Sequence, residues 1–572
     1  MDDTLMRNAS PETASVPVSR PVSAPVPPVP PALTRLLWLA VAAVVAVGVA
    51  AMLWLAPRVL YADPWRFTQK LLEMPWPSNV LVSDNGHREI LPNLVRHAEL
   101  SWLHGNQWLQ IGTGVLLALA TVWLLARIIK ADALAPPVRA AATLIGALSI
   151  FWLGSQRALT HGNESVHAYL ITAALMAGVA LLLRGDRRGA VLAAVCGVAA
   201  TFSFGSGVAV FVGLAAVLVV RRAPLSHWVP LMLGLLVAVG LHLGMGRTGM
   251  PSQMALAPLA QLDVLLRWLA SPFIYLAWPA LDPAVAQQLP FAPVRNAVHS
   301  VASGYQWLFG PVMTSRWPHL LVGAVGLGGV LGMTRCSWQR GRSAGAGESV
   351  ALAMAWFGLT VGGLVALSRW TYFADYPTQL AAPRYVPWSW LFWCGLLLWA
   401  TVRVGLRRPR PVVCGALLLA LVAVPSTAWM AYLGASMQRV ANMTATAAAA
   451  GVIDPDQTHG ESVPGEVQAA LPSLRAHGSA MFAWPETRYL EGKPTAATAS
   501  AVPLSAVSVV AVRNLLGGPA WRVEFAARSP APRLVLQCAG RPVGLAMPLA
   551  GHWVGWATGP LDAGCLEALQ LR

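Results

Sequence analysis

The strongest constraint on how this 572-residue chain can fold is a series of long apolar stretches between residues 34 and 434. A helix of about 20 mostly apolar residues is long enough to cross the hydrocarbon core of a bilayer. Eleven stretches approach this length: 34–56, 108–129, 138–154, 167–183, 189–205, 206–220, 227–245, 318–334, 348–367, 386–405 and 411–434. A single soluble core could not bury so much apolar surface against itself. We therefore expect an all-α polytopic membrane protein with about 11 transmembrane helices.

One pair of these stretches is irregular. The segments 189–205 and 206–220 are short and are interrupted at Gly205, Ser206 and Gly207. Each half is shorter than a full span requires. The pair therefore fits either two tilted helices or a re-entrant pair.

Segment 262–281 is ambiguous, because it carries Asp263, Arg267 and two prolines. Charged side chains are costly at the centre of a bilayer. We expect an interfacial or re-entrant helix here. A complete span would need a second one, near 297–315, to keep the later spans in the same orientation.

The positive charge is clustered in a way that orients the spans. Charged residues are only 11% of the chain, yet Lys and Arg exceed Asp and Glu by 40 to 24. Positive loops mark the cytoplasmic side of a membrane. The clusters occupy every second loop: Arg127/Lys130/Arg139, Arg184/Arg187/Arg188, Arg221/Arg222, Arg335/Arg340/Arg342 and Arg403/Arg407/Arg408/Arg410. We expect a bacterial inner-membrane protein with a cytoplasmic N-terminus and a periplasmic C-terminal region, and no binding of nucleic acid.

The two ends of the chain differ from the apolar middle. Residues 1–33 are rich in Pro, Ser and Val, which predicts a disordered cytoplasmic tail. Residues 435–572 form the expected periplasmic C-terminal domain. From about residue 506, short β-prone runs alternate with Gly and Pro turns, which predicts a small antiparallel β-sandwich. Cys538 and Cys565 lie there; a disulfide fits an oxidising compartment, and two free thiols remain the alternative.

The first outside loop, 57–107, has the highest density of polar side chains. It carries Asp63, Asp84, Glu89 and Glu99 together with Arg66, Lys70, His87, Arg88, Arg96, His97 and His104. A positioned carboxylate can act as a general base, and a simple linker could be shorter. The alternative is a solvated loop with an amphipathic helix.

Two later outside loops also carry charge. Arg157, His161, Glu164 and His167 lie in 154–167, but the spacing of the two histidines does not match a helical metal pair; polar caps on span ends are the alternative. Arg369, Arg384 and Tyr385 lie in 368–388. Arginine at this mouth opposes the positive-inside trend, which suggests an anionic partner such as a phosphate. The neighbouring aromatic residues fit an interfacial belt or stacking on sugar rings.

Several motifs, in order, resemble those of one superfamily. Asp63 in ADPWRFTQKLLEM resembles the acidic start of the first loop in lipid A aminoarabinose transferases and protein O-mannosyltransferases, although Pro64 replaces the second acid. DNGHREILPNLV at 84–95 resembles an E-N-G-H-R motif of bacterial relatives in polysaccharide loci. The segments 202–222, 269–273 and 382–396 are similar to later parts of those relatives. The chain thus resembles the GT-C integral membrane glycosyltransferases over roughly 34–434.

The resemblance implies an inverting transferase that moves a sugar from a polyprenyl-phosphate donor to an envelope glycan or lipid. Asp63, or failing that Asp84, would be the catalytic base. The substrate-binding set would comprise Arg384, Arg88, His87 and Arg157, which face the leaving phosphate, with His161, Glu164, Arg369 and Tyr385. No cofactor is expected; no DxD motif occurs in the first loop, so a divalent metal is possible but not indicated, and no metal ligands are predicted.

Three other functions remain open. A secondary transporter or flippase would place charges near the membrane midplane, whereas these spans are nearly free of charge. An O-antigen ligase or polymerase would carry its large loop late in the chain. A non-catalytic scaffold would use the C-terminal domain as a binding module.

Overall fold

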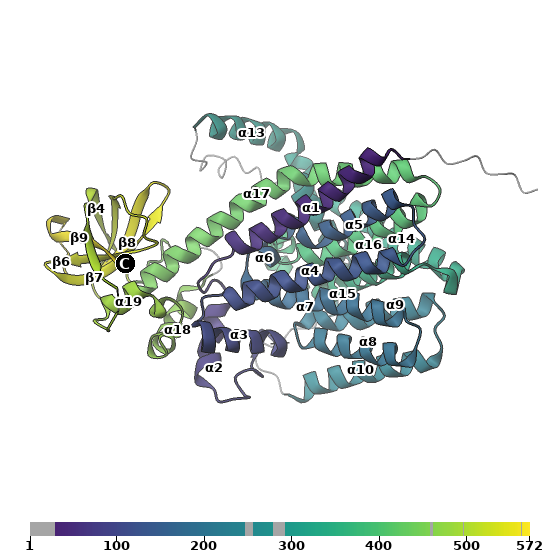
Figure 1. Cartoon of the computed structure of the whole chain (residues 1–572), viewed down its shortest axis with the longest axis horizontal. Helices are drawn as coiled ribbons and strands as arrows, with labels where there is room; N and C mark the ends of the chain where they lie inside the picture. The colour runs from purple at the N-terminus through teal and green to yellow at the C-terminus, as the bar shows by residue number, and fades with distance from the viewer. Residues whose placement is uncertain are drawn as a thin grey trace, which may run out of the picture.

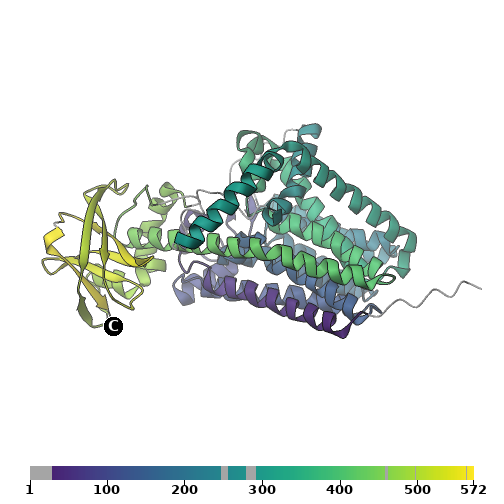
Figure 2. The ribbon, with the colours of Figure 1, turned by 90° about the horizontal axis from the view of Figure 1, so that it is seen from above.

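The computed structural model describes residues 29–245, 256–277, 292–457, 462–495, 497–561 and 563–571. A bundle of long helices occupies one end of the molecule and a β-sheet the other (Figure 1). Helix α17 (Pro409–Ala449) runs from the bundle to the sheet, as the view from above also shows (Figure 2). The predicted tail 1–33 lies almost entirely outside these residues.

The bundle is built from helices that are apolar on most of their surface. Its members are α1 (Pro31–Trp54), α4 (Trp108–Lys130), α5 (Pro136–Phe151), α7 (Gly162–Leu182), α8 (Arg187–Thr201), α9 (Ala209–Val220), α10 (Leu225–Gly244), α11 (Pro258–Ala277), α14 (Arg316–Arg340), α15 (Ala346–Asp375), α16 (Val386–Gly405) and α17. Shorter helices α2 (Pro64–Glu73), α3 (Ile90–Leu103) and α18 (Pro464–Ala476) lie between the bundle and the sheet (Figure 1). The segment 57–107, which we expected to be the first outside loop and continue to call by that name, is therefore folded.

Within the described parts of the chain, nine helices are long and apolar enough to cross a membrane, against the eleven expected. Helix α8 has only 15 residues, and the helical segment Gly205–Val220 is also short. At 1.5 Å per residue, 15 residues span about 22 Å, less than the ~30 Å hydrocarbon core. Helix α16 coincides with a predicted span but is not among the nine.

Helix α11 covers 262–277 of the segment 262–281, for which we expected an interfacial or re-entrant helix, and residues 278–281 lie outside the described ranges. Its segment Pro258–Leu276 is one of the nine candidate spans. Trp268 is fully buried, and a Cβ on Gly362 of α15 would collide with its ring. Trp393 of α16 donates a hydrogen bond to the carbonyl of Leu269 at 2.7 Å. Asp263 pairs with Arg267 and with Arg316, both at 2.7 Å, and these ion pairs offset the two charges of α11.

The second span considered near 297–315 corresponds to α13 (Ala292–Thr314), which is not one of the nine candidates. In Figure 1 this helix lies at the edge of the bundle. Its Trp307 is 82% exposed. The boundary expected at 434/435 is also displaced, because α17 continues without a break to Ala449.

Seven antiparallel strands form the C-terminal sheet. They are β3 (Ala499–Val502), β4 (Ser505–Val512), β5 (Ala520–Ala526), β6 (Leu534–Cys538), β7 (Arg541–Leu549), β8 (His552–Thr558) and β9 (Leu566–Leu571), in the order β3-β9-β6-β7-β8-β5-β4. One face, with Val535 and Trp556, shares a core with α17 and α18. The other, with Phe525 and Trp553, encloses a second core. Hydrogen bonds join all seven strands into one sheet, whereas we expected a two-sheet sandwich. Alternation along a strand predicts which side chains share a face but not which strand edges pair.

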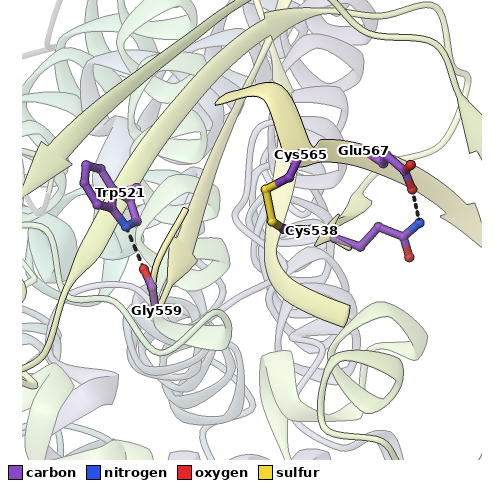
Figure 3. The surroundings of a disulfide bond; sticks show 6 residues. Trp521, Cys538, Gly559, Cys565 and Glu567 are labelled. Atoms are coloured by element: carbon purple, nitrogen blue, oxygen red, sulfur yellow. Dashed lines mark hydrogen bonds between the residues drawn. A yellow bond between two sulfur atoms is a disulfide. The ribbon is translucent and has the colours of Figure 1, made fainter. Parts of the chain in front are cut away.

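Cys538 and Cys565 form a disulfide, which settles the alternative left open by the sequence (Figure 3). It joins the end of β6 to the short turn before β9, with 4.9 Å between the Cα atoms. Beside it, Gln537 donates a hydrogen bond to Glu567 at 2.5 Å. The bond closes a loop with a sequence separation of 27 residues.

Replacing both cysteines by serine should destabilise the sheet by roughly 3–4 kcal/mol, because an open loop of this length raises the entropy of the unfolded chain. Thermal unfolding followed by tryptophan fluorescence measures the effect. The control is Cys336→Ser, which removes an exposed thiol outside any disulfide. Equal melting temperatures for the double variant and the control would contradict the expected contribution.

Candidate functional site

A cavity of about 520 Å³ lies where the first outside loop meets the bundle. Its walls come from this loop, α7, the turn after α8, α10, α15 and the start of α16. Seven of the ten predicted site residues line it: Asp63, Asp84, His87, Glu164, Arg369, Arg384 and Tyr385. Side chains from segments more than 300 residues apart in the sequence thus share one cavity.

Asp63 directly precedes α2 and makes no capping hydrogen bond to that helix. The preceding Ala62 has φ of 60°, a left-handed conformation that is unfavourable for alanine, and its N–H donates to Ser462 Oγ at 3.1 Å. The Asp63 side chain is 46% exposed and borders the cavity. Burial by the surrounding protein and the nearby Glu164 carboxylate raise its pKa, against the opposing charges of Arg66 and Arg157.

Asp84 is placed by a hairpin of β1 (Ser83–Asp84) and β2 (His87–Arg88). Asn85 and Gly86 form its turn with positive φ at both positions, as tight hairpin turns of this sequence require. Both Asp84 oxygens accept hydrogen bonds from Arg66, at 2.7 Å from Nε and 2.6 Å from Nη2. Asp63 lies 3.3 Å from the same Nη2. Asp84 is therefore bound tightly to Arg66, whereas the contact of Asp63 with Arg66 is longer and weaker.

His87 belongs to a stack of three rings. Its ring centroid is 4.1 Å from that of Phe204, whose other neighbour is His167 at 4.5 Å. The protein around His87 removes it from water, and this desolvation lowers its pKa to about 4. This shift favours the neutral form of the ring at pH 7, whereas the sequence analysis expected a cation at this position.

The break at 205–207 makes room for this stack. A Cβ at Gly205 would collide with His87 Nδ1, and one at Gly207 would collide with the carbonyl of Ala200. The turn (η2, Gly205–Val208) therefore lets Phe204 enter between the two histidines.

Gly205→Ala should destabilise the protein by about 1–3 kcal/mol, because the added methyl displaces His87 from a packed position. Thermal unfolding of the purified protein tests this. Gly240→Ala in α10 is the control, since nothing lies within 4 Å of its added Cβ, and alanine favours a helix interior. A melting temperature for Gly205→Ala equal to that of the control would show that the close approach of Gly205 and His87 does not contribute to stability.

The other three predicted site residues stabilise parts of the chain next to the cavity. Arg157 pairs with Glu164 at 3.2 Å and lies over the Tyr61 ring at 5.8 Å. His161 Nε2 is 3.1 Å from the Tyr61 carbonyl, and burial lowers the pKa of His161 to about 3. Arg88 donates to the carbonyls of Leu81 and Met245 and so ties the hairpin to the end of α10. These three are not among the residues that line the cavity, and their expected contact with substrate stays a prediction.

Arg369 and Arg384 both line the cavity, and neither forms an ion pair with a carboxylate in the part of the chain that the structure describes. Arg369 donates to the Tyr385 hydroxyl at 3.2 Å, and Arg384 donates to Gln379 at 3.0 Å. The Arg384 guanidinium lies 5.1 Å from the centre of the Tyr385 ring, and its buried Nε has no hydrogen-bond partner. Two cations thus face the cavity with neutral partners.

Part of the cavity wall is apolar. It is formed by Val239 and Leu243 of α10 with Val361, Leu364 and Leu367 of α15. Leu243 is 57% exposed and Leu367 is 42% exposed. The apolar lining therefore continues onto the outer surface of the bundle, where a lipid chain could lie.

Sequence reasoning assigned no role to four residues of this site. Glu89 pairs with the buried Arg96, and His167 lies 3.3 Å from Glu164. The three-residue spacing of Asp63 and Arg66 is the sequence signal for their ion pair, and the Asn-Gly turn is the signal for the hairpin. No sequence signal predicted the position of Phe204. The four residues are Arg66, Glu89, His167 and Phe204.

Within the described ranges, no group of three or more His, Cys, Asp or Glu side chains is arranged to hold a metal ion. One weakly paired carboxylate, Asp63, and two guanidinium groups, those of Arg369 and Arg384, border the same cavity. No protein-family model matches the chain, and no curated protein matches it either.

Proposed function

We propose that the protein is a GT-C-type membrane glycosyltransferase. It transfers a sugar from a polyprenyl-phosphate donor to a glycan or lipid acceptor on the periplasmic side of the bacterial inner membrane. The observation that carries the proposal is the composition of the cavity. A weakly paired Asp63, the two arginines without carboxylate partners and an apolar wall that reaches the outer surface all border one space. A base, a phosphate site and a lipid path are the three parts that this reaction needs.

In the proposed reaction Asp63 takes the proton from an acceptor hydroxyl. The hydroxyl oxygen then attacks the anomeric carbon, and the bond between that carbon and the phosphate oxygen breaks. The anomeric configuration inverts, and polyprenyl phosphate leaves. Its phosphate gains one negative charge as the bond breaks, so Arg369 and Arg384 stabilise the transition state more than the bound donor.

The other side chains orient these groups. Arg66 holds Asp84 through two hydrogen bonds and therefore fixes the hairpin beside Asp63. The neutral His87 and the apolar wall favour a lipid-linked substrate over a free, strongly hydrated sugar nucleotide. The charged groups gather at the end of the bundle where the first outside loop lies, a position that favours group transfer over passage through the midplane.

The direct test uses the purified protein in proteoliposomes. Polyprenyl-phosphate donors that carry a radiolabelled hexose, N-acetylhexosamine or amino sugar are presented separately, with extracted envelope glycans and lipids as acceptors. We expect label to enter one acceptor class with stoichiometric release of polyprenyl phosphate. Label that crosses the bilayer while the donor stays intact would instead identify a flippase and overturn the proposal.

A further inference from the structure

The C-terminal region reaches directly into the candidate site. Arg66 Nη1 lies 3.3 Å from Glu466 Oε1, and Glu466 belongs to the first turn of α18. The other two nitrogens of the same guanidinium are taken by Asp84. Arg66 therefore contacts three carboxylates: that of Asp63 directly before α2, that of Asp84 in the hairpin and that of Glu466 in the C-terminal region.

A second contact comes from the same segment. Ser462 Oγ accepts the hydrogen bond from the Ala62 N–H, and Ser462 is only 2% exposed. Ala62 is the left-handed residue directly before Asp63. A left-handed alanine persists only where the surrounding structure holds it, so Ser462 helps to fix the backbone from which the Asp63 side chain projects.

We propose that Ser462 and Glu466 are positioning residues for the base Asp63: Ser462 holds its backbone, and Glu466 draws the Arg66 guanidinium away from its carboxylate. This inference rests on the proposed function, because it concerns the base of that reaction. It gives the C-terminal region a role in the site, since both residues lie beyond the membrane-spanning part of the bundle.

The charges that face Asp63 come from several elements. They are Arg66 on α2, Asp84 on β1, Arg157 on α6 (Gln156–Leu159), Glu164 on α7 with the adjacent His161 and His167, and Glu466 on α18. Removing the Glu466 charge takes away a negative neighbour and weakens the bond that holds Arg66 Nη1. Both changes favour deprotonated Asp63, so the pKa of Asp63 falls and the carboxylate becomes a weaker base.

The test compares Glu466→Gln with Glu466→Asp and a matched control. Glu491→Gln removes a carboxylate of the same C-terminal region that pairs with Arg475 and Lys493 and not with Arg66. For Glu466→Gln we expect the acidic limb of the kcat/KM profile to move to lower pH by about 0.5 unit. The maximal rate should fall about twofold. Glu466→Asp should restore part of the shift, and Glu491→Gln should leave the limb unchanged.

A second measurement needs no sugar donor. Carbodiimide with glycinamide labels protonated carboxyls, and peptide mass spectrometry gives the fraction of Asp63 labelled at each pH. The midpoint for Asp63 should be lower in Glu466→Gln than in the wild type. Ser462→Ala should alter the labelling rate of Asp63 through its changed exposure.

The two measurements separate the possible failures. An unchanged Asp63 midpoint in Glu466→Gln overturns the positioning role, whatever the activity. A shifted midpoint in a protein that transfers no sugar supports the positioning role and refutes the proposed function. Loss of activity in Glu466→Gln with an unmoved acidic limb and no rescue by Glu466→Asp would mean a structural role only.

Discussion

Asp63→Asn is expected to lower the rate of sugar transfer by about 10²- to 10⁴-fold, the usual contribution of a positioned general base. The amide has nearly the same shape as the carboxylate but cannot accept the hydroxyl proton. Asp63 makes no capping hydrogen bond to α2, and among the described residues its one ion pair is with Arg66 at 3.3 Å, so its replacement should leave folding intact. Transfer from a labelled donor in proteoliposomes measures the rate, and size-exclusion chromatography measures the amount of folded protein.

The matched variants distinguish the two aspartates. Asp84→Asn loses the charge that binds Arg66 at two nitrogens, so it should lower activity through displacement of the hairpin and also lower the melting temperature. Glu73→Gln changes an exposed carboxylate on the same helix as Arg66 and should have no effect. If Asp63→Asn, Asp84→Asn and the double variant all transfer sugar at the wild-type rate, the mechanism is wrong.

The direction of the Asp63 pKa shift adds a pH signature to this prediction. A base works only when deprotonated, so activity is lost as pH falls through its pKa. Burial and Glu164 raise the pKa of Asp63, so the acidic limb should lie above the ordinary value of about 3.9 for an aspartate. This limb should be absent from the residual activity of Asp63→Asn.

Composition and periodicity predict the class of this fold well. Long apolar runs near 108–129 and 348–367 became α4 and α15, because a buried backbone in lipid can satisfy its hydrogen bonds only within a helix. Hydropathy alone could not place α11, whose Asp263 is paired with Arg267 and Arg316 at 2.7 Å. The pair with Arg267 lies within α11 and the pair with Arg316 joins α11 to α14. A hydropathy count registers neither pair, although both make the charged segment compatible with the bundle.

The sequence predicted part of the membership of the candidate site but not the roles of its residues. Loop position and residue type placed Asp63, Arg369 and Arg384 among the candidates, and all three line the cavity. The pairing of Asp84 with Arg66, which separates the two aspartates, depends on how the hairpin folds back over α2. Contacts of this kind between distant segments leave no periodic signal in a single sequence.

Arg384→Ala should weaken donor binding by about 10- to 150-fold, because a hydrogen bond to a charged group contributes roughly 1.5–3 kcal/mol and each 1.4 kcal/mol is about tenfold. Arg384 has no carboxylate partner among the described residues, so its removal leaves no buried acid unpaired and stability should change little. Because the leaving phosphate gains charge, kcat should fall together with the affinity. Equilibrium binding of a labelled donor to the purified variant, followed by steady-state kinetics, separates the two effects.

Arg187→Ala is the matched control, since Arg187 is an exposed arginine at the end of α8 remote from Phe204. Arg384→Lys should recover part of the affinity, because an ammonium keeps the charge but loses the planar, bidentate contact with phosphate. Donor affinity unchanged in Arg384→Ala would exclude this side chain from the phosphate site. The same result in Arg369→Ala as well would remove the basis for a phosphate site at this mouth, since these two guanidinium groups are the ones that face the cavity without a carboxylate partner in the described residues.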